Sequence, residues 1–153
     1  MLIKAFLRDR FSLVVFGGSQ VVMDIQPGVF VLTGIGSLHG LSHTYLAATL
    51  IGLFCAVSGK YLGEMFLWRI RWADFLPIRW PVAFISAFIG TYSHVFIDDI
   101  MHADAHPLLP FSRYSPAYGL MNMGALHLFC VLCFIMGLVL YFAVADWPMR
   151  KKG

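Results

Sequence analysis

Long apolar runs are the feature that most constrains this chain, because a soluble fold of this size could not bury them all. Hydrophobic residues make up 59% of the 153 residues without the 14 glycines, only 12% are charged, and mean hydropathy is +0.77. An average soluble domain is about 45–50% apolar with glycine included and about 25% charged. The composition therefore predicts an integral membrane protein with the lipid bilayer as its surroundings.

We expect one all-α membrane domain, residues 1–153, with about four transmembrane helices. About 20 apolar residues normally cross a bilayer, and the first run is the shortest of the four. Pro27-Gly28 predicts a helix end there, followed by a short interfacial segment at residues 29–38. The expected spans are roughly 5–25, 42–59, 81–100 and 119–145.

The connection between the second and third spans mixes charged residues with tryptophans. This combination is typical of a helix that lies in the headgroup region, and we place such an interfacial helix near residues 64–76.

The basic residues predict the orientation. Ten of the eleven Lys and Arg residues lie in the N-terminal ten residues, between the second and third spans, or after the fourth span. Because loops rich in Lys and Arg stay in the cytoplasm, both termini are expected there. The remaining outer segments would face the periplasm if this is the inner membrane of a bacterium. The formal charge of +3 is no sign of nucleic-acid binding, because the basic residues lie between spans rather than on one face.

Ionisable side chains gather in the stretch from His94 to His106, at the outer end of the third span. It holds three of the six histidines and three of the seven aspartates. Ionisable groups at such a depth are costly, and they are by default hypotheses for a functional site.

Two further segments are expected to reach the same membrane depth. His39 and His43 are four residues apart, so they share a face if the second helix has begun there. His94 and Asp98 repeat that spacing, and Asp24 lies near the outer end of the first span. We predict these five residues as metal ligands. Histidine and carboxylate together suit zinc first, with manganese or iron as alternatives, and one or two ions could bind.

Other polar residues of the outer side are candidates for further roles. His102, His106 and Gln20 are candidates for additional contacts of the metal site. Asp99 or Asp104 could act as the general base, and Arg113, the only basic residue of the outer loops, could hold an anionic substrate or lipid headgroup. The alternative interpretation of each is a solvated loop residue or a hydrogen bond across the bundle.

Four motifs of the chain form a characteristic series: Val21-Val-Met-Asp24, His39-Gly-Leu-Ser-His43-Thr-Tyr-Leu, Gly90-Thr-Tyr-Ser-His94-Val-Phe-Ile-Asp98 and Pro107-Leu-Leu-Pro-Phe-Ser. In order and spacing they resemble the YdjM-like family of membrane-bound, predicted metal-dependent hydrolases. The resemblance covers roughly residues 17–116, and it implies a helical membrane protein whose presumed metal ligands are the five residues named above. The chain lacks the Arg or Lys that often follows the first histidine of the family, and its acidic motif is reduced to one Asp.

Together these features predict a membrane-embedded, metal-dependent hydrolase that acts on a phosphoester or other ester, such as a lipid, at the outer membrane face. The alternative is a non-catalytic metal-binding membrane protein or a small subunit of a larger complex. Either could form homo- or hetero-oligomers. The inner halves of the spans hold almost no ionisable residues, which counts against a transporter.

Overall fold

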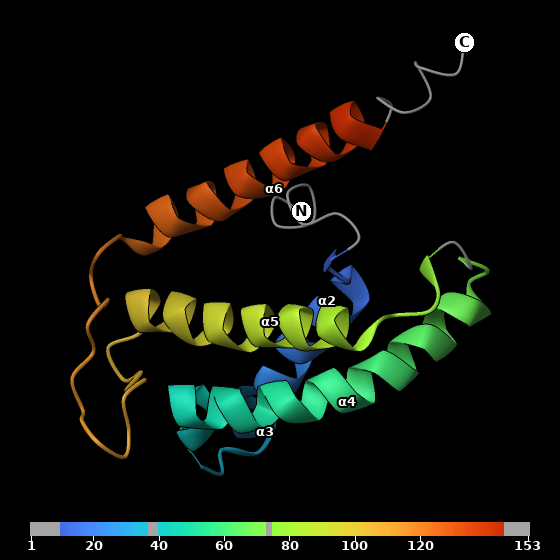
Figure 1. Ribbon diagram of the computed structural model, residues 1–153. Coiled ribbons are helices and arrows are strands. Elements are labelled where there is room, and N and C mark those ends of the chain that lie inside the picture. Colours follow the sequence, from blue (N-terminus) through green and yellow to red (C-terminus); the bar gives the residue numbers. More distant parts are fainter. Residues whose placement is uncertain (1–9, 37–39, 73–74, 146–153) are drawn as a thin grey trace.

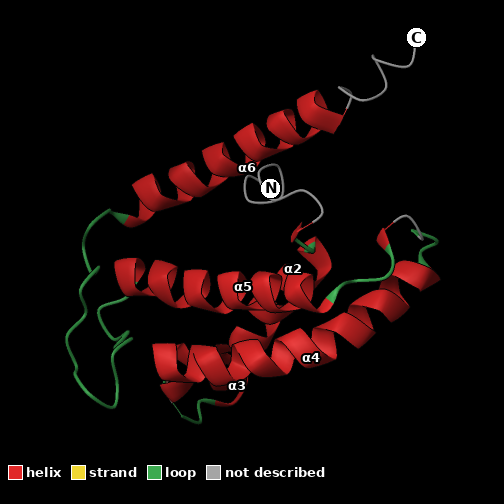
Figure 2. Ribbon diagram, in the orientation of Figure 1, coloured by secondary structure: helices red, strands yellow, loops and turns green. Residues whose placement is uncertain are grey.

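The computed structural model describes residues 10–36, 40–72 and 75–145. This described part is helical throughout, with no strand, and loops join the helices (Figure 2). The elements in chain order are α2 (Leu13–Met23), α3 (Ile25–Thr33), the 3-10 turn η2 (Leu41–His43), α4 (Tyr45–Arg69), α5 (Trp80–Met101) and α6 (Met123–Ala145).

Four helical stretches are long and apolar enough to cross a membrane. This confirms the predicted all-α fold class and is the expected form of a multi-pass membrane protein. The stretches are Leu13–Thr33, which combines α2 and α3, then Tyr45–Arg69, Trp80–Met101 and Met123–Leu140.

The first span differs from the expectation. Its helix does not end at Pro27, and α3 continues to Thr33, where Gly34 closes it in a left-handed conformation with φ 71°. The interruption lies one turn earlier, at Asp24, which ends α2 and precedes α3. Proline lacks an N–H and its ring clashes with the carbonyl four residues before it, here that of Met23, so the break falls there. Residues 29–33 therefore belong to the span rather than to a separate interfacial segment.

The second difference concerns the predicted interfacial helix near 64–76. Residues up to Arg69 continue α4 without a break, so 64–69 form the end of the second span. No proline interrupts this part of the chain. The carboxylate of Glu64 accepts a hydrogen bond from the backbone N–H of Ile78 at 2.9 Å, which fastens the returning segment against α4.

Small residues let three of the helices approach one another closely. The cluster that joins α2, α4 and α5 includes Val15, Cys55, Ala56 and Ala87. At Gly90 of α5, a Cβ atom would overlap the hydroxyl of Ser19 on α2. Small residues at helix interfaces are the usual means by which transmembrane helices pack, because van der Waals contact replaces the hydrophobic effect there.

The start of α4, the end of α5 and the start of α6 lie at one end of the molecule (Figure 1). The loop between α5 and α6 covers that end, and its Pro107 carbonyl accepts a hydrogen bond from the backbone N–H of Tyr45 at 2.9 Å. Leu126 of α6 packs against Ile100 and Ala117, and beyond this point α6 diverges from α5.

Candidate metal centre

The first half of the site lies on α5. His94 and Asp98 are four residues apart on one face of this helix, and Nε2 of His94 lies 3.2 Å from Oδ2 of Asp98. His94 is seven residues before Met101, the last residue of α5. At 1.5 Å per residue this places it about 10 Å inside the end of the helix. His94 therefore lies about two turns inside the helix, and Asp98 lies about one turn closer to its end.

His43 approaches this pair from the beginning of the second span. It is 1% exposed, its Nε2 lies 3.2 Å from Oδ2 of Asp98, and its ring centroid is 5.3 Å from that of His94. His43 lies in η2 rather than in α4. His43 is therefore not part of the second helix, as the predicted i, i+4 face with His39 requires, and His39 itself lies outside the described residues.

The cause of this difference is the cap of α4. Thr44 has an extended backbone, φ −113° and ψ 153°, and its hydroxyl accepts a hydrogen bond from the N–H of Ala47 at 3.1 Å. A threonine that caps a helix in this way makes the following residue the first helical one. The helix consequently begins at Tyr45, and His43 is held by the 3-10 turn just before it.

Asp24, at the break between α2 and α3, is the third residue of the cluster. Its Oδ1 lies 3.3 Å from Nε2 of His94, and its side chain is 62% exposed, whereas that of His94 is 12% exposed. Asp24, His43 and His94 each offer one ligand atom, and these atoms all lie within 4.8 Å of one another. The cluster could therefore hold a metal ion.

The Nε2 atom of His94 is buried, and among the described residues it has no hydrogen-bond partner of acceptable direction. Two carboxylate oxygens, of Asp24 and Asp98, nevertheless lie within 3.3 Å of it. Imidazole nitrogens and carboxylate oxygens that converge in this way are of the ligand types that a divalent cation binds in proteins.

Two glutamines of the first span support the outer sides of the imidazoles, Gln20 directly and Gln26 through Ser42. Gln20 Oε1 lies 2.7 Å from Nδ1 of His94. Gln26 Oε1 accepts from the hydroxyl of Ser42, which lies 2.8 Å from Nδ1 of His43. Gln20 is among the contacts that the sequence predicts, whereas Gln26 is not. The sequence does contain a signal for Gln26, because Gln20 and Gln26 are the only two glutamines of the chain and they lie on either side of Asp24.

Asp99 has a different place from the one expected of a general base. It is fully buried, and its carboxylate accepts hydrogen bonds from the hydroxyl of Ser115 and, at 3.0 Å, from the N–H of Ala117. Successive residues of a helix point about 100° apart, so Asp98 faces the imidazoles while Asp99 faces the loop. The contacts of Asp99 tie the loop between α5 and α6 to α5.

The remaining predicted residues lie in that loop. His102 directly follows α5 as its C-cap, Asp104 and Arg113 are exposed, and His106 is half-buried. Within the described ranges, no group of three possible metal ligands other than Asp24, His43 and His94 comes together, so His102 and His106 are not part of a second cluster.

No family model, no curated protein and no solved structure matches this chain. The fold and the site alone define the class: a helical protein with four membrane-length apolar helices and a His-His-Asp cluster that could hold a metal ion.

Proposed function

We propose that this protein is a membrane-embedded, metal-dependent hydrolase that acts on a phosphoester or other ester at the outer membrane face. One observation carries the proposal: three separate helical segments deliver the side chains of Asp24, His43, His94 and Asp98 to one point. The proposal agrees with the activity that the resemblance to the YdjM-like family implies.

The energetic argument favours a cation at this point. A buried charge that lacks compensation costs several kcal/mol, and the carboxylate of Asp98 is only 13% exposed, with the exposed carboxylate of Asp24 also close to His94. A divalent ion would neutralise this charge. Nitrogen and oxygen ligands suit zinc first, and manganese or iron could take the same set.

The exposure of the ligands supports catalysis over a closed structural site. Asp24 is largely exposed, whereas His43 is almost completely buried. Catalytic metal sites keep one side open for water or substrate, and structural sites are closed by protein ligands. A metal in such a site lowers the pKa of a bound water to about 7 and polarises the bond that breaks.

The loop between α5 and α6 supplies the other proposed roles. Because both oxygens of Asp99 hold the loop, we assign proton transfer to the exposed Asp104 and a positioning role to Asp99. Arg113 is exposed on the same loop and would hold the anionic group of a substrate. A lipid ester at the membrane surface is one such substrate.

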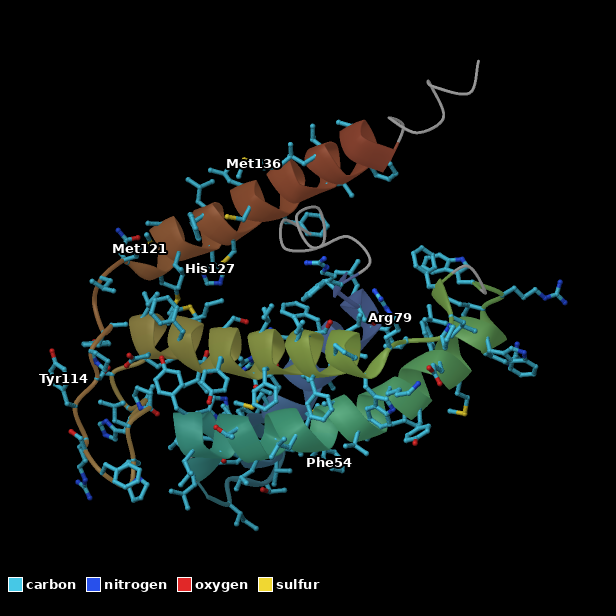
Figure 3. All side chains as sticks on the ribbon, in the orientation of Figure 1. Phe54, Arg79, Tyr114, Met121, His127 and Met136 are labelled. Atoms are coloured by element: carbon cyan, nitrogen blue, oxygen red, sulfur yellow. The ribbon has the colours of Figure 1, made fainter. Side chains whose placement is uncertain are left out.

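The charge distribution supports an outward-facing site in the inner membrane of a bacterium. Arg79 lies at the end of α5 opposite the loop that carries Tyr114 (Figure 3). The described basic residues other than Arg113 lie at or near the Arg79 end, at Arg10, Lys60, Arg69, Arg71 and Arg79. By the positive-inside rule, the end with Arg79 is cytoplasmic and the metal cluster faces the periplasm.

A second candidate is a non-catalytic metal-binding protein or a subunit of a larger complex. The position of α6 favours it, because α6 leaves the other helices after Leu126 and exposes apolar residues along its length. Such surfaces suit either lipid or the helices of another protein chain, in a homo- or hetero-oligomer.

The two candidates are separated by combining metal analysis with activity. Detergent-purified protein should contain about one divalent ion per chain, and His43→Ala and His94→Ala should each lose it. His127→Ala is the matched control, because this exposed histidine bonds to the Met123 carbonyl of its own helix at 2.7 Å. Hydrolysis of phospholipid, phosphomonoester or carboxylester substrates that disappears with the metal supports the hydrolase. Metal-loaded protein that is inert on all three panels would favour the non-catalytic alternative.

A further inference from the structure

The contacts of Gln20 fix the direction of its own amide group. One end of the amide donates to the backbone carbonyl of Gly90 at 3.2 Å and to the hydroxyl of Ser93 at 3.4 Å. A backbone carbonyl can only accept, so the atom that faces it must be the amide nitrogen. The other end, which faces His94, is therefore the carbonyl oxygen Oε1.

This direction determines where the proton of His94 lies. Gln20 Oε1 has no hydrogen, and it lies 2.7 Å from Nδ1 of His94, so Nδ1 must carry the hydrogen of that bond. A neutral imidazole has only one N–H, and its other nitrogen then has a lone pair. The lone pair is on Nε2, the atom that faces Asp24 and Asp98.

A second chain of contacts has the same effect on His43. Gln26 accepts from the backbone N–H of Ser42 at 3.1 Å, so the atom that faces Ser42 is the carbonyl oxygen. The hydroxyl of Ser42 donates its single hydrogen to this same oxygen. It can then only accept from Nδ1 of His43, 2.8 Å away, which places the hydrogen on Nδ1 and the lone pair on Nε2.

We propose that Gln20 and Gln26 are positioning residues that hold both metal-site histidines in the Nδ1–H form. This inference rests on the proposed metal site and extends it. The first span then supplies three residues of the site within a stretch of seven: the ligand Asp24, and Gln20 and Gln26, which orient the imidazoles of His94 and His43. Outer partners of this kind fix the tautomer and orientation of metal-bound histidines and typically contribute 10–100-fold to metal affinity.

The direct test is ¹⁵N NMR of the metal-free protein in detergent, with ¹⁵N-labelled histidine, recorded over a series of alkaline pH values until the spectrum shows both imidazoles in their neutral form. The signals of His43 and His94 are assigned by their loss in the His→Ala variants. We expect both residues to show a protonated Nδ1 and an unprotonated Nε2. Free histidine in water favours the opposite form, so solvent exposure alone would not produce this result.

Substitutions separate a positioning role from a structural one. Gln20→Leu should move His94 to a mixture of tautomers and leave His43 unchanged, while Gln20→Glu, which still offers an acceptor, should keep the wild-type form. Ser42→Ala should move His43 to a mixture of tautomers and leave His94 unchanged. Ser19→Ala is the control, because this buried neighbour bonds only to the Phe16 carbonyl of its own helix among the contacts described.

Zinc affinity, measured by competition with a chromogenic chelator, gives the second readout. Gln20→Leu should bind zinc about 10–100-fold more weakly, with Gln20→Glu within a few-fold of wild type. An Nε2–H form in the wild-type protein, or a Gln20→Leu variant with unchanged tautomer and affinity, would overturn the inference. Wild-type protein with the expected tautomers but without zinc affinity would instead refute the proposed metal site and leave the tautomer assignment intact.

Discussion

Nε2 of His43, which precedes α4, lies 3.2 Å from Oδ2 of Asp98, near the end of α5. The same oxygen lies 3.2 Å from Nε2 of His94. One carboxylate oxygen thus meets two imidazole nitrogens that come from different helical segments. Asp98 is therefore the residue that links the second span to the third within the site.

This position predicts that Asp98→Asn weakens metal binding, because the neutral amide removes a negative charge beside both imidazoles. The loss should be at least that expected for a residue that only orients a metal-bound histidine, about 10–100-fold. Zinc competition measures the effect. Asp104→Asn, a change of the same kind in the exposed loop, should leave affinity unchanged. Equal losses in both variants would mean that charge near the membrane surface, rather than the site itself, governs binding.

Asp99 should behave differently from its neighbour. Its carboxylate holds the loop through Ser115 and Ala117, so Asp99→Asn should lower the free energy of unfolding by about 1–3 kcal/mol and should leave zinc affinity near wild type. Denaturation in detergent and limited proteolysis of the loop measure this. A variant of unchanged stability that loses about 10²–10⁴-fold in hydrolysis would instead identify Asp99 as the general base.

The close approach of α2 and α5 predicts the effect of a single methyl group. In Gly90→Ala the new Cβ would overlap the Ser19 hydroxyl and come within 3.1 Å of the Phe16 carbonyl, so the two helices must separate. We expect a loss of about 1–3 kcal/mol in stability, together with weaker zinc binding, because Gln20 bonds to Gly90.

Gly18→Ala is the matched control for this prediction. A Cβ at Gly18 meets nothing within 4 Å, so the substitution should be neutral or stabilise α2 by up to about 1 kcal/mol. If both alanine variants unfold at the same temperature as the wild type, the close packing of α2 on α5 is wrong.

The sequence predicted the architecture and much of the site, for a physical reason. Apolar runs must form helices in a bilayer, and the polar residues within them can be placed by depth, so Asp24, His43, His94 and Asp98 were expected together. The α-helical period also pairs His94 with Asp98 and not with Asp99. These inferences depend only on local spacing and on the membrane.

Other features depend on the chemistry of single residues or on contacts between distant ones. The break at Asp24 arises one turn before Pro27, and His43 lies outside α4 because Thr44 caps that helix. The role of Gln26 needs the turn that holds Ser42, 16 residues away, to fold back onto α3. Composition and periodicity do not contain this information.

The proposed orientation makes a prediction about labelling in a variant that lacks the three cysteines. Two exposed residues are suitable probe positions: Tyr114 in the loop between α5 and α6, and Trp72 in the connection between α4 and α5. In intact cells an impermeant maleimide should label Tyr114→Cys, and it should label Trp72→Cys only after permeabilisation. The reverse pattern would place the metal cluster on the cytoplasmic side.

The most direct measurement of the metal site is X-ray absorption at the zinc edge, on protein loaded with one equivalent of zinc. The account predicts a shell of nitrogen and oxygen ligands at about 2.0–2.2 Å, with the outer-shell scattering of two imidazoles. In His43→Ala and in His94→Ala the scattering of only one imidazole should remain. A shell with sulfur at about 2.3 Å, or a spectrum unaltered by either substitution, would contradict the assignment of this cluster as the metal centre.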